Sequence, residues 1–299
     1  MSALPDPRAS LALPRGDGAG AAAEGGPPLL RLPEPGRLFD ARAARFAALA
    51  VGHAAPAWLT LLSRIAGGQA RAVREVRCAA PAPRPGRPLA YGELPRDAAW
   101  RGMLAVILEA SRARGLPAPT EDALRRLDRA GEGELESLAD AVLSGAVPAD
   151  RLACAPFVGA ALQAWLAVLA ARAEATAAPA GACPMCGGPP LAARIRAGDR
   201  LRDVCCAVCG TEWNVPRVRC VSCETSAGPE YFEVDAEPGA KVEACPTCRT
   251  YLKLFDEEKR PGAEPAADDA ATLALDLRLA EDGFHRAGPN LYVGTSAAG

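Results

Sequence analysis

The sequence predicts a multi-domain protein, in which an all-α N-terminal bundle precedes two small β lobes that each hold a four-cysteine metal site. Three observations carry this prediction. Apolar residues recur at helical spacing through the first half, short alternating runs replace them after about residue 180, and nine of the eleven cysteines lie between Cys183 and Cys248. Since 49% of the 299 residues are apolar, the chain can bury a sizeable core.

The first segment, residues 1–33, is predicted to be a disordered leader. It is rich in Ala, Gly and Pro, and charged residues interrupt it, so it has no apolar run typical of a secretion signal. The most apolar stretch elsewhere, 160–171, is shorter than the ~20 residues that a membrane span needs. We therefore expect a cytoplasmic protein without direct membrane insertion, whose reduced cysteines serve metal binding or thiol chemistry.

The helical domain is expected to cover residues 34–178. Apolar stripes at helical spacing predict its helices, with Pro56 suited to the first turn of the second helix and a Pro-rich break at 80–88 after it. The stripes run over residues 39–50, 58–72, 100–108, 124–127, 135–142 and 158–173. We interpret their aromatic and Met residues as core rather than a cofactor pocket, because such residues at this spacing usually pack inside.

The cysteine-rich half begins after a linker at 175–182. Runs such as TEWNVPRVRC and EYFEVD predict strands, which we divide into a first lobe at 183–214 and a second at 215–260. A C-terminal helix and tail are expected at 265–293. Two acidic residues should lie near the start of that helix, and its apolar stripe should face the core. These residues are Asp268 and Asp269, then Leu273, Leu277, Ala280 and Phe284.

Four Cys-x-x-Cys pairs carry the chemistry. They are Cys183/Cys186, Cys206/Cys209, Cys220/Cys223 and Cys245/Cys248. Such a turn can present two thiolates to one ion at ~2.3 Å, and a tetrahedral structural site needs two turns. Pairing in chain order gives C-x2-C-x19-C-x2-C and C-x2-C-x21-C-x2-C, close to the spacing of a zinc ribbon. We favour this order over an interleaved one, in which the first pair would join the third.

The four-thiolate shells limit which metals the sites can bind and which chemistry they can support. Four thiolates suit iron and zinc alike, so we predict two metal ions, iron or zinc. A complete four-cysteine shell leaves no open position for water or substrate, so hydrolytic catalysis is not expected and the protein is predicted not to be an enzyme. A thioredoxin-like dithiol is the alternative for a single pair, but no βαβ unit surrounds any of them.

The other notable residues have structural interpretations. Cys205 abuts Cys206 and breaks the spacing, so we interpret it as a buried or spare thiol, with ligand exchange or redox chemistry as the alternative. Cys78 and Cys154 should be small buried residues of the helical half. Trp213 should fill the core of its lobe.

A set of consecutive motifs resembles the formate dehydrogenase accessory proteins of the FdhE family. The motifs are CPMCGGPP, CCAVCGTEWNVPRVRCVSCE and CPTCRTYLKLFDEEK, followed by AADDAATLALDLRLAEDGF. The resemblance covers about 183–293, and 42–69 more weakly. It implies rubredoxin-like metal lobes with the eight paired cysteines as ligands. It also implies a cytoplasmic helper that contacts the catalytic subunit of a molybdenum-dependent formate dehydrogenase and is required for its activity.

Two other functions remain as alternatives to a maturation factor. One is an iron-thiolate electron-transfer or thiol oxidoreductase module. The other is a nucleic-acid-binding zinc ribbon, which the charge disfavours because residues 183–260 hold eleven basic and twelve acidic residues. We therefore expect no nucleic-acid partner, and the oligomeric state is not predicted. Candidate client contacts are the segments 210–213 and 249–253, with ordinary packing as the alternative.

Overall fold

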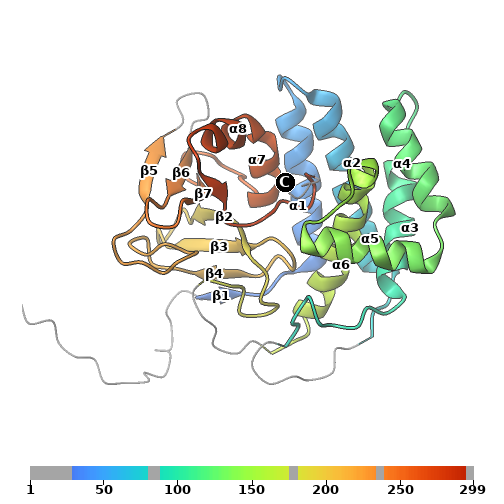
Figure 1. The fold of residues 1–299 in the computed structure, drawn as a ribbon, viewed down its shortest axis with the longest axis horizontal. Coiled ribbons are helices and arrows are strands. Elements are labelled where there is room, and N and C mark those ends of the chain that lie inside the picture. The colour runs from blue at the N-terminus through green and yellow to red at the C-terminus, as the bar shows by residue number, and fades with distance from the viewer. Residues whose placement is uncertain (1–28, 80–87, 175–180, 234–238, 294–299) are drawn as a thin grey trace, which may run out of the picture.

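The computed structural model describes residues 29–79, 88–174, 181–233 and 239–293. A helical half and a strand-rich half lie side by side, and the last two helices cover the sheet next to the first helix (Figure 1). The predicted fold class is therefore confirmed. Residues 1–28 of the expected leader and 175–180 of the expected linker lie outside the described residues.

Helices form the N-terminal half around a buried central helix. In the described residues they are α1 (Pro35–Ala50), α2 (Pro56–Glu75), α3 (Ala99–Ser111), α4 (Ala118–Arg129), α5 (Glu132–Ser144), the 3-10 helix η1 (Ala149–Cys154) and α6 (Ala155–Ala170). Proline begins α1 and α2, where its missing N–H is not needed. Every residue of α6 except Pro156 is buried, and α1, α2, α3 and α5 pack against it.

The length and composition of one helical stretch, Ala149–Ala170, would allow it to cross a membrane. In the fold, 83% of its apolar window is buried inside the protein. Most of the surface of this stretch therefore packs against other parts of the protein, as in the core helix of a folded domain.

The strands form one continuous sheet, which joins the two lobes. They are β1 (Leu30–Arg31), β2 (Pro190–Ile195), β3 (Arg202–Cys206), β4 (Glu212–Asn214), β5 (Glu230–Glu233), β6 (Ala240–Ala244), β7 (Thr250–Asp256) and β8 (His285–Arg286). Within the described residues their order is β1-β4-β3-β2-β7-β6-β5, and β8 also pairs with β7. The lobes meet where β2 and β7 pair in parallel, with Ala193 opposite Leu254. This pairing was not predicted, since nothing local to either strand indicates it.

The end of the expected leader is ordered in the structure. Leu30 pairs with Trp213 across the β1–β4 ladder, and Asn214 donates its backbone N–H to the carbonyl of Leu29 at 2.8 Å. Arg31 forms an ion pair with the buried carboxylate of Asp203 at 2.7 Å. Residues 29–33 therefore belong to the folded protein, because the ladder and the ion pair hold them against β4.

The predicted C-terminal helix is two shorter helices, α7 (Pro265–Ala271) and α8 (Leu273–Glu281), which is a correction. Thr272 breaks the helix, with φ of −109° and ψ of 33°. The buried ammonium of Lys253 donates to the carbonyls of Asp269 and Thr272 at 2.9 and 3.0 Å. It therefore provides hydrogen bonds to carbonyl groups at the helix break, where the regular helical partners end. The expected core-facing stripe is also wrong, because no residue of α8 is buried and Leu277 is 71% exposed.

A buried polar cluster joins α1, α2, α6 and the C-terminal segment. Arg42 donates to Glu264 at 2.9 and 2.8 Å and to the hydroxyl of Tyr292 at 3.3 Å. The Tyr292 hydroxyl in turn donates to the side-chain carbonyl of Gln69. Arg42 also donates to Gln163 of α6 at 3.4 Å. Segments far apart in the sequence therefore meet at one charge pair, which has little exposure to solvent.

Candidate metal centres

The eight paired cysteines form two clusters in the order that the spacing predicted. Within each cluster the four Sγ atoms lie within 4.8 Å of one another. The closest pairs are Cys183–Cys209 at 3.6 Å, Cys186–Cys206 at 3.5 Å, Cys220–Cys248 at 3.7 Å and Cys223–Cys245 at 3.8 Å. A tetrahedron with metal–sulfur bonds of ~2.3 Å has sulfur–sulfur edges of ~3.8 Å. Both donor sets therefore fit a tetrahedral ion, and interleaved pairing is excluded.

All four knuckles share one backbone conformation. The residue after the second cysteine has φ between 57° and 74° in each case. These residues are Gly187, Gly210, Glu224 and Arg249. The turn directs backbone N–H groups at sulfur, as from Gly188 to Cys186 at 3.3 Å. Such hydrogen bonds favour the thiolate form that a metal requires.

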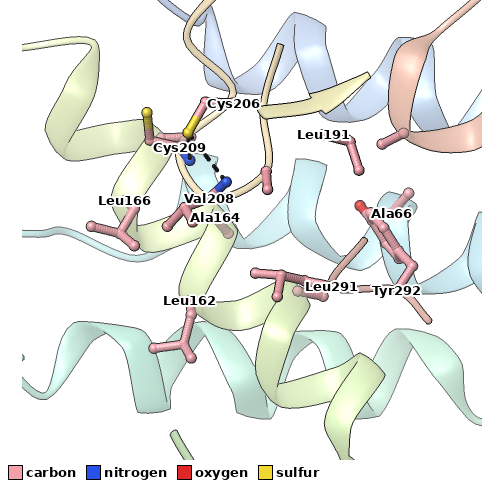
Figure 2. Close-up of a cluster of buried hydrophobic side chains, with 14 of the residues drawn as sticks. Ala66, Leu162, Ala164, Leu166, Leu191, Cys206, Val208, Cys209, Leu291 and Tyr292 are labelled. Carbon is pink, nitrogen blue, oxygen red and sulfur yellow. Dashed lines mark hydrogen bonds between the residues drawn. The ribbon is translucent and has the colours of Figure 1, made fainter. Parts of the chain in front are cut away.

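The first site is enclosed by the helical domain. Its four cysteines are 0–2% exposed, and they belong to the same hydrophobic core as α6. Figure 2 shows the Cys206–Cys209 turn beside Ala164 and Leu166 of that helix. Gln163 donates its side-chain amide to the carbonyl of Ala207 at 2.7 Å. The fold of the first knuckles is therefore coupled to the bundle.

A loop of the helical domain also holds the first site. The N–H groups of Leu89 and Tyr91 donate to the carbonyls of Met185 and Cys186, each at 3.1 Å. No local pattern in the sequence indicates this contact, and Gln163 stands out in the sequence only as a polar residue in an apolar run. A polar residue on an otherwise apolar helix was the available clue, because a buried amide needs a partner.

The second site reaches the surface. Cys220 and Cys245 are buried, but Cys248 is half-buried and Cys223 is exposed. A separate small core of Val242, Ala244 and Tyr251 lies under Leu279 and Phe284 of the C-terminal segment. Other apolar residues of this lobe, such as Leu252 and Phe255, belong to the main core. The two clusters thus offer the same donors in different surroundings.

The thiols of the first cluster differ in acidity. At Cys183, burial raises the pKa, but hydrogen bonds with Cys186, Cys206 and Cys209 outweigh it and lower the pKa well below the ordinary thiol value. Burial and the other thiols raise the pKa of Cys206 instead. One sulfur of the cluster therefore ionises readily, and an ion must displace protons from its neighbours.

We expect the affinity of the second site for metal to fall as the pH is lowered. Burial raises the pKa of Cys220 to about 12, whereas at Cys245 burial is outweighed by backbone hydrogen bonds from Cys248 and Thr247, which lower its pKa to about 7. Metal binding must deprotonate Cys220 at any neutral pH, and below pH 7 it must also deprotonate Cys245. For each proton that metal binding displaces, the affinity falls about tenfold for every unit by which the pH is lowered. Competition with a coloured chelator at several pH values measures this dependence. A flat affinity between pH 8 and pH 6 would contradict it.

We also expect Gly188→Ala to weaken the first site. A Cβ atom at this position would lie 2.9 Å from Val208, 3.1 Å from the sulfur of Cys186 and 3.2 Å from that of Cys206. Such overpacking costs ~1–3 kcal/mol and should speed metal release to a chelator. Gly198→Ala is the matched control, because a Cβ there meets nothing within 4 Å. Equal rates of metal release from the two variants would show that the close contacts of a Cβ at position 188 do not weaken the site.

The cysteines outside the clusters occupy the buried positions expected of them. Cys205 is buried, and burial raises its pKa well above the ordinary thiol value. Cys78 and Cys154 are buried in the helical half. Trp213 is buried in the first lobe, where it pairs with Val204 of β3.

The two segments proposed as client contacts are largely inside the protein, which corrects that expectation. In 210–213, Thr211 and Trp213 are buried, and a Cβ on Gly210 would lie 2.8 Å from Leu38 of α1. In 249–253, Tyr251, Leu252 and Lys253 are buried in β7, between β6 and β2. Their flanking cysteines suggested exposed knuckle tips, but the ladders cover both segments.

The fold and the clusters define a class of protein in which a helical domain is joined to paired four-cysteine lobes. Each cluster already supplies four sulfur donors, the number that a closed structural site requires. The arrangement therefore suits tight metal binding and a metal-shaped surface better than the activation of water.

Comparison with known proteins identifies the family. Models described as "FdhE, N-terminal", "FdhE, central domain" and "FdhE, C-terminal domain" match residues 27–181, 182–217 and 218–293. A Pseudomonas aeruginosa "Protein FdhE homolog" is 38% identical over 289 residues, which span 88% of this chain and 92% of that protein. One from Pseudomonas putida is 36% identical over 293 residues, with 89% and 90% covered. The chain belongs to the FdhE family.

A solved structure supports the same relationship. The crystal structure of the FdhE protein from Pseudomonas aeruginosa matches with a TM-score of 0.80 at 35% sequence identity. The match covers 90% of this chain and 100% of that one. The arrangement of helical domain and lobes therefore extends to a relative with about one third of its residues identical.

Proposed function

We propose that this protein is an accessory factor required for the maturation of a formate dehydrogenase. The observation that carries the proposal is the match of three consecutive FdhE domain models over residues 27–293, in a chain that contains two four-cysteine clusters. The proposed client is the catalytic subunit of a molybdenum-dependent enzyme, bound in the cytoplasm. The protein itself is proposed to be non-enzymatic, because each cluster would hold a metal in a closed shell.

The eight clustered cysteines are the proposed ligands of two metal ions, iron or zinc. A bound ion would cross-link the two knuckles of each lobe and so fix the conformation of the surface around them. Metal analysis of anaerobically purified protein tests this. We expect about two equivalents, with a red thiolate-to-iron absorption if the metal is iron and no colour if it is zinc.

Deletion of the gene in its own host tests the function. We expect formate oxidation to be lost and to return on complementation with the wild-type gene. The tagged protein should also co-purify with the catalytic subunit. Undiminished formate oxidation in the deletion strain, with no co-purifying subunit, would refute the assignment.

Electron transfer through an iron site is a second candidate, which the exposure of one ligand favours. Cys223 is exposed, so an iron ion in the second site would lie close to solvent and to a redox partner. Reversible one-electron reduction of the iron-loaded protein, lost in Cys223→Ser, would support this candidate. Redox-inactive protein that still restores formate oxidation would eliminate it.

A further inference from the structure

The outermost strand of the second lobe, β5, presents an open edge. All four of its residues, Glu230–Glu233, are exposed, whereas every residue of β7 except Thr250 is buried. Within the described part of the chain, β5 pairs with β6 alone, and Figure 1 shows it at the end of the sheet away from the helical half. Alternate residues of an antiparallel strand direct N–H and C=O away from the neighbouring strand. Two of the four residues therefore offer backbone groups to another strand.

Both faces of this edge carry an exposed aromatic side chain. Tyr231 and Phe232 are 40% and 47% exposed, and as consecutive strand residues they point to opposite faces. Phe232 shares its face with Val242, opposite it on β6. Tyr231 lines a cavity of about 480 Å³ together with Val218, which is 73% exposed. An added strand would cover apolar surface on both sides.

The second metal site positions this edge. The hydroxyl of Tyr231 donates to the carbonyl of Arg217 at 2.8 Å, three residues before Cys220. Between Cys223 and β5 the chain makes a turn, whose Thr225 carbonyl accepts a hydrogen bond from Cys220 at 3.3 Å. Metal loading of the second lobe would therefore also order the strand.

The charges on β5 indicate the kind of strand that it accepts. Antiparallel pairing with a second copy of β5 in the symmetric register would place Glu230 opposite Glu233, and like charges directly opposite are destabilising. Glu233 pairs with Lys241 at 2.7 Å, whereas Glu230 has no ion-pair partner among the described residues. The edge thus suits a different polypeptide, with a basic residue near Glu230 and apolar residues beside it.

We propose that β5 is the docking edge for an extended segment of the client polypeptide, which adds to the sheet as a further strand. The segment would combine apolar side chains, packed against Tyr231 and Phe232, with a basic side chain near Glu230. Backbone hydrogen bonds would supply affinity and the side chains specificity, as in other strand-addition complexes. This inference rests on the proposed function, since it identifies where that client binds.

The test compares variants of the full-length, metal-loaded protein for binding to the purified catalytic subunit of the host's formate dehydrogenase. We expect the double variant Tyr231→Ser, Phe232→Ser to lose affinity at least tenfold, and Glu230→Lys to lose it as well. Leu277→Ser, which removes a 71% exposed side chain from α8, is the matched control and should bind normally. Two metal equivalents and an unchanged unfolding midpoint in each variant would exclude misfolding as the cause.

Three results would overturn the docking edge. Normal binding by the double variant would show that the client docks elsewhere, while the proposed function stands. If the wild-type protein sediments as a dimer and the double variant as a monomer, the edge is occupied by a second copy of this chain. If the wild-type protein does not bind the subunit and the deletion strain oxidises formate normally, the proposed client is wrong, and the proposed function with it.

Discussion

Cys183→Ser should lose one metal equivalent and destabilise the whole protein, whereas Cys223→Ser should lose one equivalent and leave the helical half stable. The first site shares the main core with α6 and is hydrogen-bonded to Gln163 and to the loop at 88–91. Loss of its metal should therefore expose apolar surface of the helical bundle. A structural zinc site contributes on the order of 10 kcal/mol in small domains, which is comparable to the ~5–15 kcal/mol stability of a domain. Metal analysis and thermal unfolding followed by helical circular dichroism measure both effects.

The control for these two variants is Cys78→Ser, which alters a buried thiol of the helical half outside both clusters. It should keep two metal equivalents. If Cys183→Ser and Cys223→Ser had the same unfolding midpoint, the first site would not be coupled to the bundle. Retention of two equivalents by both would refute the two-site arrangement.

Glu264→Gln should reduce the stability of the protein by ~3–5 kcal/mol, because it leaves the guanidinium of Arg42 buried without a counter-charge. The two side chains are 8% and 3% exposed, and their atoms approach to 2.8 Å. Glutamine keeps a side-chain oxygen for the N–H of Ala267, which Glu264 caps at the start of α7. The substitution therefore tests the charge more than the cap. Chemical denaturation measures the free energy of unfolding.

The matched control for the charge pair is Asp40→Asn. Asp40 pairs with Arg74 at the surface, where both side chains are more than half exposed, so solvent already screens the interaction. We expect no measurable change in stability for this variant. An equally small change for Glu264→Gln would mean that the cluster around Arg42 accommodates the loss, for example by admitting water.

Local spacing was enough to predict the helices, the cysteine clusters and their pairing. A Cys-x-x-Cys turn closes over a few residues, and the distance between two such turns is limited by the strands between them, so the chain order of the knuckles is informative. The stripe of α6 was equally clear, because its apolar residues recur at helical spacing on a helix that is buried all round.

Other features depended on partners far away in the sequence. The break at Thr272 lies in a segment with good helical spacing, and Lys253 on another strand stabilises the released carbonyls. Leu30 and Arg31 follow directly on a stretch rich in Ala, Gly and Pro, yet β4 and Asp203 hold them in the fold. Neither partner is visible in the local pattern.

The amino-acid sequence alone predicts which residues form each four-cysteine cluster, since the donors and the turns that present them lie within short stretches. The difference between the clusters comes from the fold, which encloses the first beside α6 and leaves the second open at Cys223. The fold also joins the lobes in one sheet through β2 and β7 and leaves β5 at the edge of that sheet. Burial and strand order depend on contacts between distant segments, which the spacing of residues along the chain does not specify.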